Sequence, residues 1–147
     1  MKIQIINGPN LNLLGKREPE KYGTTSFEEY LGKIRNQFPE IKIDYFQSNI
    51  EGEIISKIHE TGFSFDGIIL NAGGYTHTSV SVADAVDSVK TPVIEVHITN
   101  LAAREEFRHV SLVGRYSKGS IIGLGLDGYR LAVEALIEMS MKREKAK

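Results

Sequence analysis

Short apolar runs alternate with amphipathic segments along the whole chain. The apolar runs predict strands at residues 2–7, 41–47, 67–71, 93–98 and 119–124. The first, third and fourth are rich in Ile and Val, which is typical of strands buried on both faces of a parallel sheet. The amphipathic segments predict helices at residues 26–38, 51–61, 78–89 and 128–142, with a short helical turn at 102–107. The last seven residues, MKREKAK, are expected to be frayed.

This alternation of strands and helices predicts a parallel sheet with helices on both faces. Five strands in a chain of 147 residues favour the flavodoxin-like, doubly wound order 2-1-3-4-5. We therefore expect an α/β fold that forms a single domain over residues 1–147.

The composition narrows the class of protein. A hydrophobic content of 41% and a net charge of -1 fit a globular protein with no basic field for nucleic acid. No apolar run approaches the roughly 20 residues of a membrane span. The lack of cysteine excludes disulfides and thiol catalysis and fits a cytoplasmic protein. Because the first predicted strand begins at residue 2, we expect no signal peptide.

Three polar clusters follow the predicted strands. NGPN follows the first strand, NAGGYTH follows the third, and EVHITN ends the fourth. The carboxyl ends of parallel strands meet at one edge, where open α/β sheets bind ligands at the point of reversed strand order. The clusters therefore predict a ligand site between strands one and three.

The segment between the first strand and the first helix is unusually long. Residues 8–25 form a link of 18 residues, whereas such loops usually take about 2–6. The link contains GKREPEKYG, with Arg17 and Tyr22, and it ends at a predicted capping box of Ser26 and Glu29. A polar loop of this length indicates a functional role.

GLGLDG, at residues 123–128, matches the glycine pattern of dinucleotide-binding proteins. That pattern needs a following strand with an acidic residue about 20 residues later. Only 19 residues follow Gly128, and they read as one helix. We therefore interpret the glycines as close packing of the last helix on the sheet.

His77 and Asp84 lie seven residues apart and are expected on one face of one helix. With Ser79 or Ser81 they suggest a hydrolase triad, but the chain has no G-x-S-x-G elbow. Two interpretations stay open: His77 caps the helix, or the pair binds hydroxyl groups.

Glu95 and His97 alternate with apolar residues and should share one face of the fourth strand. With His77 they suggest a metal site, although no metal-binding spacing supports it. Alternatively, Glu95 orients a histidine acid, or the pair is structural. Arg104 and Arg108 follow this strand, either as a solvated face or as an anion-binding pair.

Four blocks together resemble the type II 3-dehydroquinate dehydratases: INGPNLNLLGKREPEKYG, NAGGYTHTSVSVADA, VIEVHITNLAAREEFRH and GSIIGLGLDGYRLA. The resemblance spans nearly the whole chain and keeps the order and spacing of the family's motifs. One difference is Thr99, where the family often has serine; both residues supply a hydroxyl and a backbone N–H.

The resemblance implies a lyase of the shikimate pathway of aromatic amino acid biosynthesis. It would dehydrate 3-dehydroquinate to 3-dehydroshikimate without a metal, a cofactor or an imine. It also implies a homo-oligomer of trimers packed into a dodecamer, with a small-molecule substrate and neither nucleic acid nor membrane as partner. The alternative that we weigh is a flavodoxin-like nucleotide or flavin binding protein.

The resemblance assigns five catalytic residues. Tyr22 would be the general base that removes the proton beside the ketone, and Arg17 would stabilise the developing charge. Asn10 would hold a water on the enolate oxygen. His97 would protonate the departing hydroxyl, with Glu95 orienting it.

The remaining implied site residues would surround the substrate. The resemblance places Asp84 in the site of a neighbouring subunit and Arg104 near Tyr22. The implied substrate-binding residues are Asn71, His77, Asp84, Ile98, Thr99, Arg104 and Arg108.

Tyrosine is a demanding choice of base. With an ordinary pKa of about 10, its ionisation at pH 7 costs about 4 kcal/mol. A neighbouring cation moves a pKa by roughly 1–3 units, so Arg17 and Arg104 would recover most of that cost. We therefore expect the long loop to be a lid that carries the base and its activating cation.

Overall fold

A computed structural model describes all residues, Met1–Lys147. Its five parallel strands form one sheet in the order β2-β1-β3-β4-β5, which confirms the predicted order. The strands are β1 (Lys2–Asn7), β2 (Lys42–Gln47), β3 (Gly67–Asn71), β4 (Val93–His97) and β5 (Gly119–Ile122).

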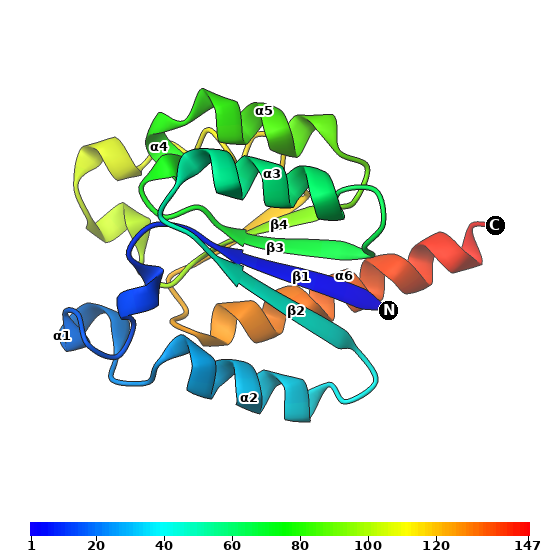
Figure 1. Ribbon diagram of the computed structural model, residues 1–147, viewed down its shortest axis with the longest axis horizontal. Helices are drawn as coiled ribbons and strands as arrows, with labels where there is room; N and C mark the ends of the chain where they lie inside the picture. The colour runs from blue at the N-terminus through cyan, green and yellow to red at the C-terminus, as the bar shows by residue number, and fades with distance from the viewer.

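Helices cover both faces of this sheet, as predicted (Figure 1). One face carries α2 (Phe27–Gln37) and α6 (Asp127–Lys145), and the other carries α3 (Glu51–Thr61) and α5 (Val80–Ser88). Shorter elements gather at the carboxyl ends of the strands. They are η1 (Leu11–Leu13), α1 (Pro19–Tyr22), α4 (Tyr75–Thr78), η2 (Leu101–Ala103) and η3 (Glu106–Arg108).

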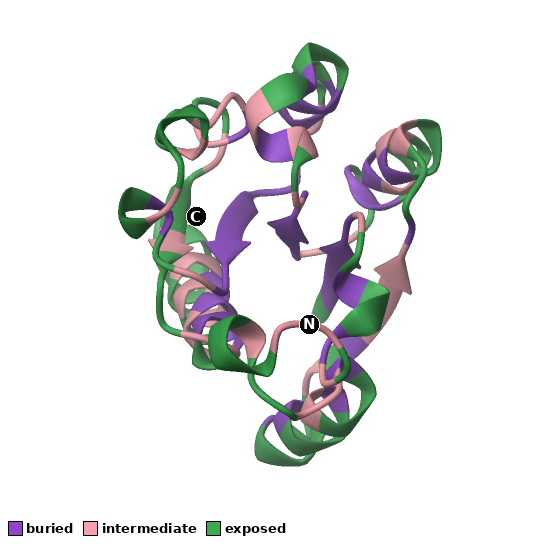
Figure 2. Cartoon of the chain, turned by 90° about the vertical axis from the view of Figure 1, so that its left-hand side faces the viewer, coloured by how far each residue is buried: buried purple, intermediate pink, exposed green.

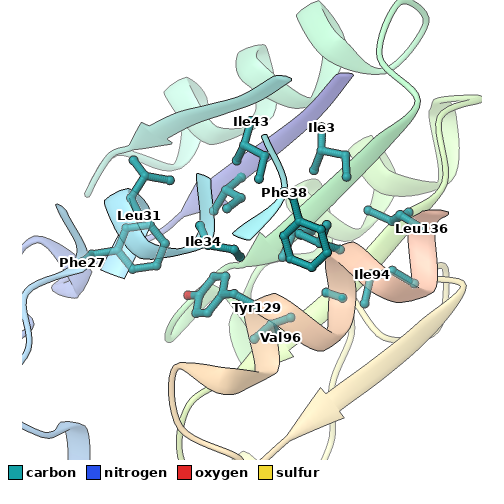
Figure 3. Packing of buried hydrophobic residues seen from close by; sticks show 14 of the residues in the cluster. Ile3, Phe27, Leu31, Ile34, Phe38, Ile43, Ile94, Val96, Tyr129 and Leu136 are labelled. Atoms are coloured by element: carbon teal, nitrogen blue, oxygen red, sulfur yellow. The ribbon is translucent and has the colours of Figure 1, made fainter. Parts of the chain in front are cut away.

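Two apolar clusters hold these layers together, one on each face of the sheet. On the α2 and α6 side, Phe27, Leu31 and Ile34 follow helical spacing and pack with inward residues of the strands and with Tyr129 (Figure 3). On the other side, Ile54 and Ile58 are fully buried. Burying a side chain of this size contributes about 1.5–3 kcal/mol, so both layers are firmly held.

The predicted helix over residues 78–89 is wrong in one respect. α4 ends at Thr78, Ser79 is extended with φ -97° and ψ 100°, and α5 begins at Val80. The Ser79 hydroxyl accepts a hydrogen bond from Val82 N at 2.9 Å, which makes it the N-cap of a new helix. His77 and Asp84 therefore do not share a helix face, and the expected pairing is corrected.

The ends of the last elements also differ from prediction. α6 runs to Lys145, so the expected fraying of the last seven residues is wrong. Lys142 pairs with Glu138 one turn earlier, and the basic residues of the last turn favour the negative end of the helix. At the start of α2, the Ser26 hydroxyl accepts from Glu29 N at 3.2 Å, which is one half of the predicted capping box.

Candidate active site

A cleft opens at the carboxyl ends of the strands, with about 710 Å³ of space between its walls and the solvent at its mouth. Figure 2 views the molecule from this end, with the buried strands at the centre of a ring of more exposed segments. Ten of the twelve residues named from the sequence line the cleft: Asn10, Arg17, Tyr22, Asn71, His77, His97, Ile98, Thr99, Arg104 and Arg108.

The loops after β1 and β3 meet at the floor of this cleft. Gly8 N donates to Asn71 O at 2.7 Å, and a Cβ at Gly8 would lie only 2.6 Å from Ala72 O. Only glycine fits this close approach. The contact holds the two loops together at the point where the strand order reverses, as the polar clusters predicted.

Glu95 does not line the cleft but lies buried behind His97, with 1% of its surface exposed. Its Oε1 lies 2.5 Å from His97 Nε2 and accepts from Ser111 Oγ at 2.6 Å. Its Oε2 accepts from Ser120 Oγ at 2.7 Å. Glu95 thus joins the imidazole to two hydroxyl groups inside the fold.

The electrostatics of Glu95 favour the carboxylate. Burial alone would raise its pKa, but the hydrogen bond and charge of His97, with the hydroxyls of Ser111 and Ser120, hold the pKa below its ordinary value. Because a carboxylate only accepts, His97 carries its proton on Nε2. This geometry supports the interpretation in which a carboxylate orients a histidine, and the carboxylate oxygens that a metal would need are already hydrogen-bonded.

His77 lies beside His97 and is held from outside its own helix. Its Nδ1 lies 2.7 Å from Val110 O, in the segment after η3. The rings of His77 and His97 are 6.2 Å apart and inclined by 24°. His77 therefore does not act as a helix cap but faces the cleft, whereas Asp84 is exposed on α5 and does not line it.

The link of residues 8–25, between β1 and α2, folds back on itself. Gly15 has φ +87°, and a Cβ there would lie 2.8 Å from Thr24 O, so the two ends of the segment touch. We refer to residues 15–24 as the lid. Within it, Glu18 adopts the left-handed conformation with φ 39°, which costs roughly 1–2 kcal/mol outside glycine. Its carboxylate lies 3.1 Å from Arg17 Nε and 3.2 Å from Lys21 Nζ.

Two guanidinium groups flank Tyr22 of the lid. Arg17 Cζ lies 5.2 Å from the centre of the Tyr22 ring. Arg104 Nη1 donates to the Tyr22 hydroxyl at 3.3 Å and to Thr99 Oγ1 at 3.2 Å. One guanidinium group therefore contacts the Tyr22 hydroxyl, and the other lies against the Tyr22 ring.

Arg108 completes the positive side of the cleft. Its Nε lies 2.8 Å from Glu105 Oε2, and Arg104 Nε lies 3.8 Å from the same oxygen. Both arginines line the cleft, so they are not merely a solvated face. Guanidinium groups suit planar anions such as carboxylates.

Sequence reasoning missed the two serines behind Glu95. Ser120 lies directly opposite Glu95 in the register of β4 and β5, so strand alternation alone could have found it. Ser111 lies in an irregular segment and carries no periodic signal. The sequence reading also left unnamed the apolar residues and glycines of the wall, which are Pro9, Leu11, Leu13, Leu14, Gly73, Gly74 and Leu101.

The glycine-rich segment 123–128 does not line the cleft. A Cβ at Gly128 would lie 3.3 Å from Val96 Cγ1 and 3.4 Å from Ile121 Cγ2. The glycine therefore lets α6 approach the sheet closely, which confirms the packing interpretation and does not favour dinucleotide binding.

The fold and the cleft define a flavodoxin-like α/β protein with acid–base side chains at the switch point of its sheet. The family described as Dehydroquinase class II matches residues 1–137, and the chain belongs to that family. A 3-dehydroquinate dehydratase of Halothermothrix orenii is 48% identical over 143 residues, covering 96% of this chain and 97% of that protein.

Two further relatives agree. A 3-dehydroquinate dehydratase of Fusobacterium nucleatum is 52% identical over 144 residues, with 94% of this chain and 97% of that protein covered. The crystal structure of the type II dehydroquinase from Butyrivibrio crossotus superposes with a TM-score of 0.89 at 46% identity, covering 92% of this chain and 97% of that one. None of the helices combines the length and the apolar character needed to span a membrane.

Proposed function

We propose that this chain catalyses the dehydration of 3-dehydroquinate to 3-dehydroshikimate in the shikimate pathway. One observation carries the proposal: a single cleft brings Arg17 and Tyr22 of the lid together with His97, whose imidazole is held by buried Glu95. Membership of the class II dehydroquinase family supports the same reaction.

Tyr22 acts as the base in the first step. Its phenolate oxygen takes the proton from the carbon beside the ketone, and the electron pair of that C–H bond moves into the carbonyl to form an enolate. Arg17 and Arg104 stabilise the phenolate before transfer, and Arg17 stabilises the negative charge that develops. Asn10, at the cleft wall, holds a water that donates to the enolate oxygen.

His97 acts as the acid in the second step. The enolate electrons form the new C=C bond, the C–O bond breaks, and the hydroxyl leaves as water. The imidazolium form of His97 supplies the proton for this water from Nδ1, because Nε2 donates to Glu95. Glu95 keeps the imidazole in one orientation and stabilises its charged form.

The other polar residues of the cleft bind the substrate's carboxylate and hydroxyl groups. Arg108 and the backbone and hydroxyl donors of Ile98 and Thr99 suit the carboxylate, and Asn71 and His77 suit the hydroxyls. Arg104 links the lid to this set through its hydrogen bonds to Tyr22 and Thr99.

Asp84 serves the site of a neighbouring subunit in a dodecamer built from trimers. Its exposed position outside its own cleft is compatible with that role. Mixed oligomers of Asp84→Ala and His97→Ala chains should regain turnover, because some interfaces then hold one intact site. Sedimentation velocity measures the assembly, and a lack of recovery in verified mixed oligomers would place Asp84 within its own subunit's site or make it structural.

The decisive experiment measures the conjugated enone product by its ultraviolet absorbance. Purified protein should generate it from 3-dehydroquinate after dialysis against a strong chelator, and borohydride with substrate should not trap an adduct. A flavin or nucleotide binding protein would instead co-purify with a chromophore and show no turnover. Two expectations stay predictions: cell fractionation tests the cytoplasmic location, and reversible unfolding in one transition tests the single domain.

A further inference from the structure

A chain of three buried polar side chains runs beneath the cleft. Asn7 and Asn71 occupy paired positions at the ends of β1 and β3, and Tyr129 reaches them from α6. Asn7 and Tyr129 are fully buried, and Asn71 is 4% exposed where it lines the cleft. The reaction proposed above uses Asn71 but assigns nothing to Tyr129.

The hydrogen bonds of this chain have a defined direction. The Tyr129 hydroxyl donates to Asn7 Oδ1 at 2.7 Å, and Asn71 Nδ2 donates to the same hydroxyl at 3.0 Å. Because a phenol has one proton and Asn7 receives it, Tyr129 can only accept from Asn71. Gly73 N donates to Asn71 Oδ1 at 3.2 Å from the other side.

These two contacts define the orientation of the Asn71 amide. A flipped amide would set its oxygen against the Tyr129 oxygen and its nitrogen against the Gly73 N–H. One Nδ2–H remains for a ligand in the cleft. Asn71 therefore presents a hydrogen-bond donor, which suits a hydroxyl or carboxylate oxygen.

The fold retains this network at a cost. Asn7 Nδ2 is buried without a hydrogen-bond partner, although an unpaired buried donor is unfavourable. Burial also raises the pKa of Tyr129, so the hydroxyl keeps its proton throughout the working range of pH. An apolar core at this place would avoid the cost but would leave Asn71 without its partner.

The Tyr129 ring is held independently of its hydroxyl. It packs edge-on against Phe27 at 5.0 Å and lies among the apolar residues between α2, α6 and the sheet (Figure 3). Tyr129→Phe therefore removes one oxygen atom and keeps the packing. Tyr30→Phe is a matched control, because Tyr30 lies 6.2 Å from the Tyr129 ring and its hydroxyl accepts only from Arg130 N.

We propose that Tyr129 is a positioning residue, whose hydroxyl orients the Asn71 amide so that its free Nδ2–H meets a hydroxyl or carboxylate oxygen of the substrate. The inference rests on the proposed function, since it names how that site recognises its substrate. It makes α6, far from the lid in sequence, part of substrate recognition.

Steady-state kinetics test this role. Tyr129→Phe should raise KM by about 3- to 10-fold with kcat changed by less than about twofold, as expected for one lost hydrogen bond that serves binding. Tyr30→Phe should leave both constants unchanged. In an Asn71→Ala background, Tyr129→Phe should have no further effect, because its action passes through Asn71.

A neutron crystal structure of the Tyr129→Phe variant distinguishes amide oxygen from nitrogen and supplies a readout that does not depend on turnover. The Asn71 amide should be flipped or occupy two conformers, while Phe27 and the backbone of α6 keep their positions. An unchanged Asn71 amide, an unchanged KM, or an equal effect in the Asn71→Ala background would overturn the inference. If the wild-type protein shows no turnover, only the proposed function is refuted, because the crystal structure still decides how the Asn71 amide is oriented.

Discussion

The lid and the floor of the cleft supply the two halves of the proposed reaction in different ways. The floor here means His97 at the end of β4 with Glu95 behind it, where Glu95 is almost fully buried and accepts hydrogen bonds from His97 and two serines. In the lid, the Arg17 and Glu18 side chains remain 37% and 40% exposed, and the segment is closed by the approach of Gly15 to Thr24.

This difference shows which half of the site must be rigid and which must move. The acid must keep one tautomer and one orientation, so it sits on a strand and is held by buried groups. The base and its cations must come onto the substrate after it enters, so they sit on a segment with few buried contacts. Lid variants should therefore change turnover with little effect on stability, whereas floor variants should change both.

The largest effect is expected at Tyr22. Tyr22→Phe should lower kcat by about 10²–10⁴-fold, because it removes the base and only one oxygen atom. The thermal midpoint should stay unchanged, since the residue lies in the lid. Tyr116→Phe, outside the cleft, is the control. Near-normal kcat in folded Tyr22→Phe protein would remove Tyr22 from the role of base.

Arg17 comes next. Arg17→Ala should lower kcat by about 10²–10³-fold, as for the loss of one charged group at a developing anion. The pH at which turnover rises should also move upward, because the phenolate loses a neighbouring cation. Arg17→Lys should rescue only partly, since an ammonium group does not reproduce a planar fork. A pH–rate profile for each variant measures this, and identical profiles would assign Arg17 to the lid's structure.

Glu95→Gln tests the difference between the lid and the floor, because it should affect both turnover and stability. We expect kcat to fall by roughly 10–100-fold and the free energy of unfolding by about 1–3 kcal/mol, since an amide cannot accept at both former carboxylate oxygens. Either the Ser120 hydroxyl, or the Ser111 hydroxyl together with His97 Nε2, would then face a donor. Chemical denaturation measures the stability, with exposed Glu138→Gln as the control. A stable but inactive variant would indicate a purely chemical role.

The pH dependence of stability tests the same carboxylate. Because the folded state lowers the pKa of Glu95 below 4.5, the carboxylate stabilises the fold above that pH. This contribution is lost as the pH falls from about 4.5 through the lower folded pKa. Unfolding free energies measured from pH 7 to pH 3 should therefore fall less steeply for Glu95→Gln than for the wild type. Equal slopes would show that Glu95 is not held as a carboxylate.

The smallest effect is expected at Ser120. Ser120→Ala removes one of the donors to Glu95, which acts on the reaction only through His97, so kcat should fall only about 2- to 10-fold, in line with one ordinary hydrogen bond. The acid limb of the pH–rate profile should move to higher pH, because the carboxylate becomes easier to protonate. Exposed Ser88→Ala is the control, and an unmoved acid limb would remove Ser120 from the support of Glu95.

Much of the molecule follows from the sequence by itself. The Ile- and Val-rich runs and the helical spacing between them predicted the sheet, its strand order and the covering helices. The polar clusters after strands one, three and four predicted where the cleft lies. The fold and the place of the cleft depend on periodicity and on chain direction, which neighbouring residues encode. The individual site residues came from the family resemblance, and ten of the twelve line the cleft.

Only the tertiary structure decided the contacts between distant parts of the chain. Asn71 and Tyr129 are 58 positions apart, and Ser111 reaches Glu95 across 16 positions. No local pattern encodes such pairs, because they depend on how helices and loops pack once the sheet has formed. The break at Ser79 has a related cause: a single hydroxyl that caps Val82 N overrides a continuous helical pattern. Periodicity placed the functional side chains at one edge, and packing decided which of them touch.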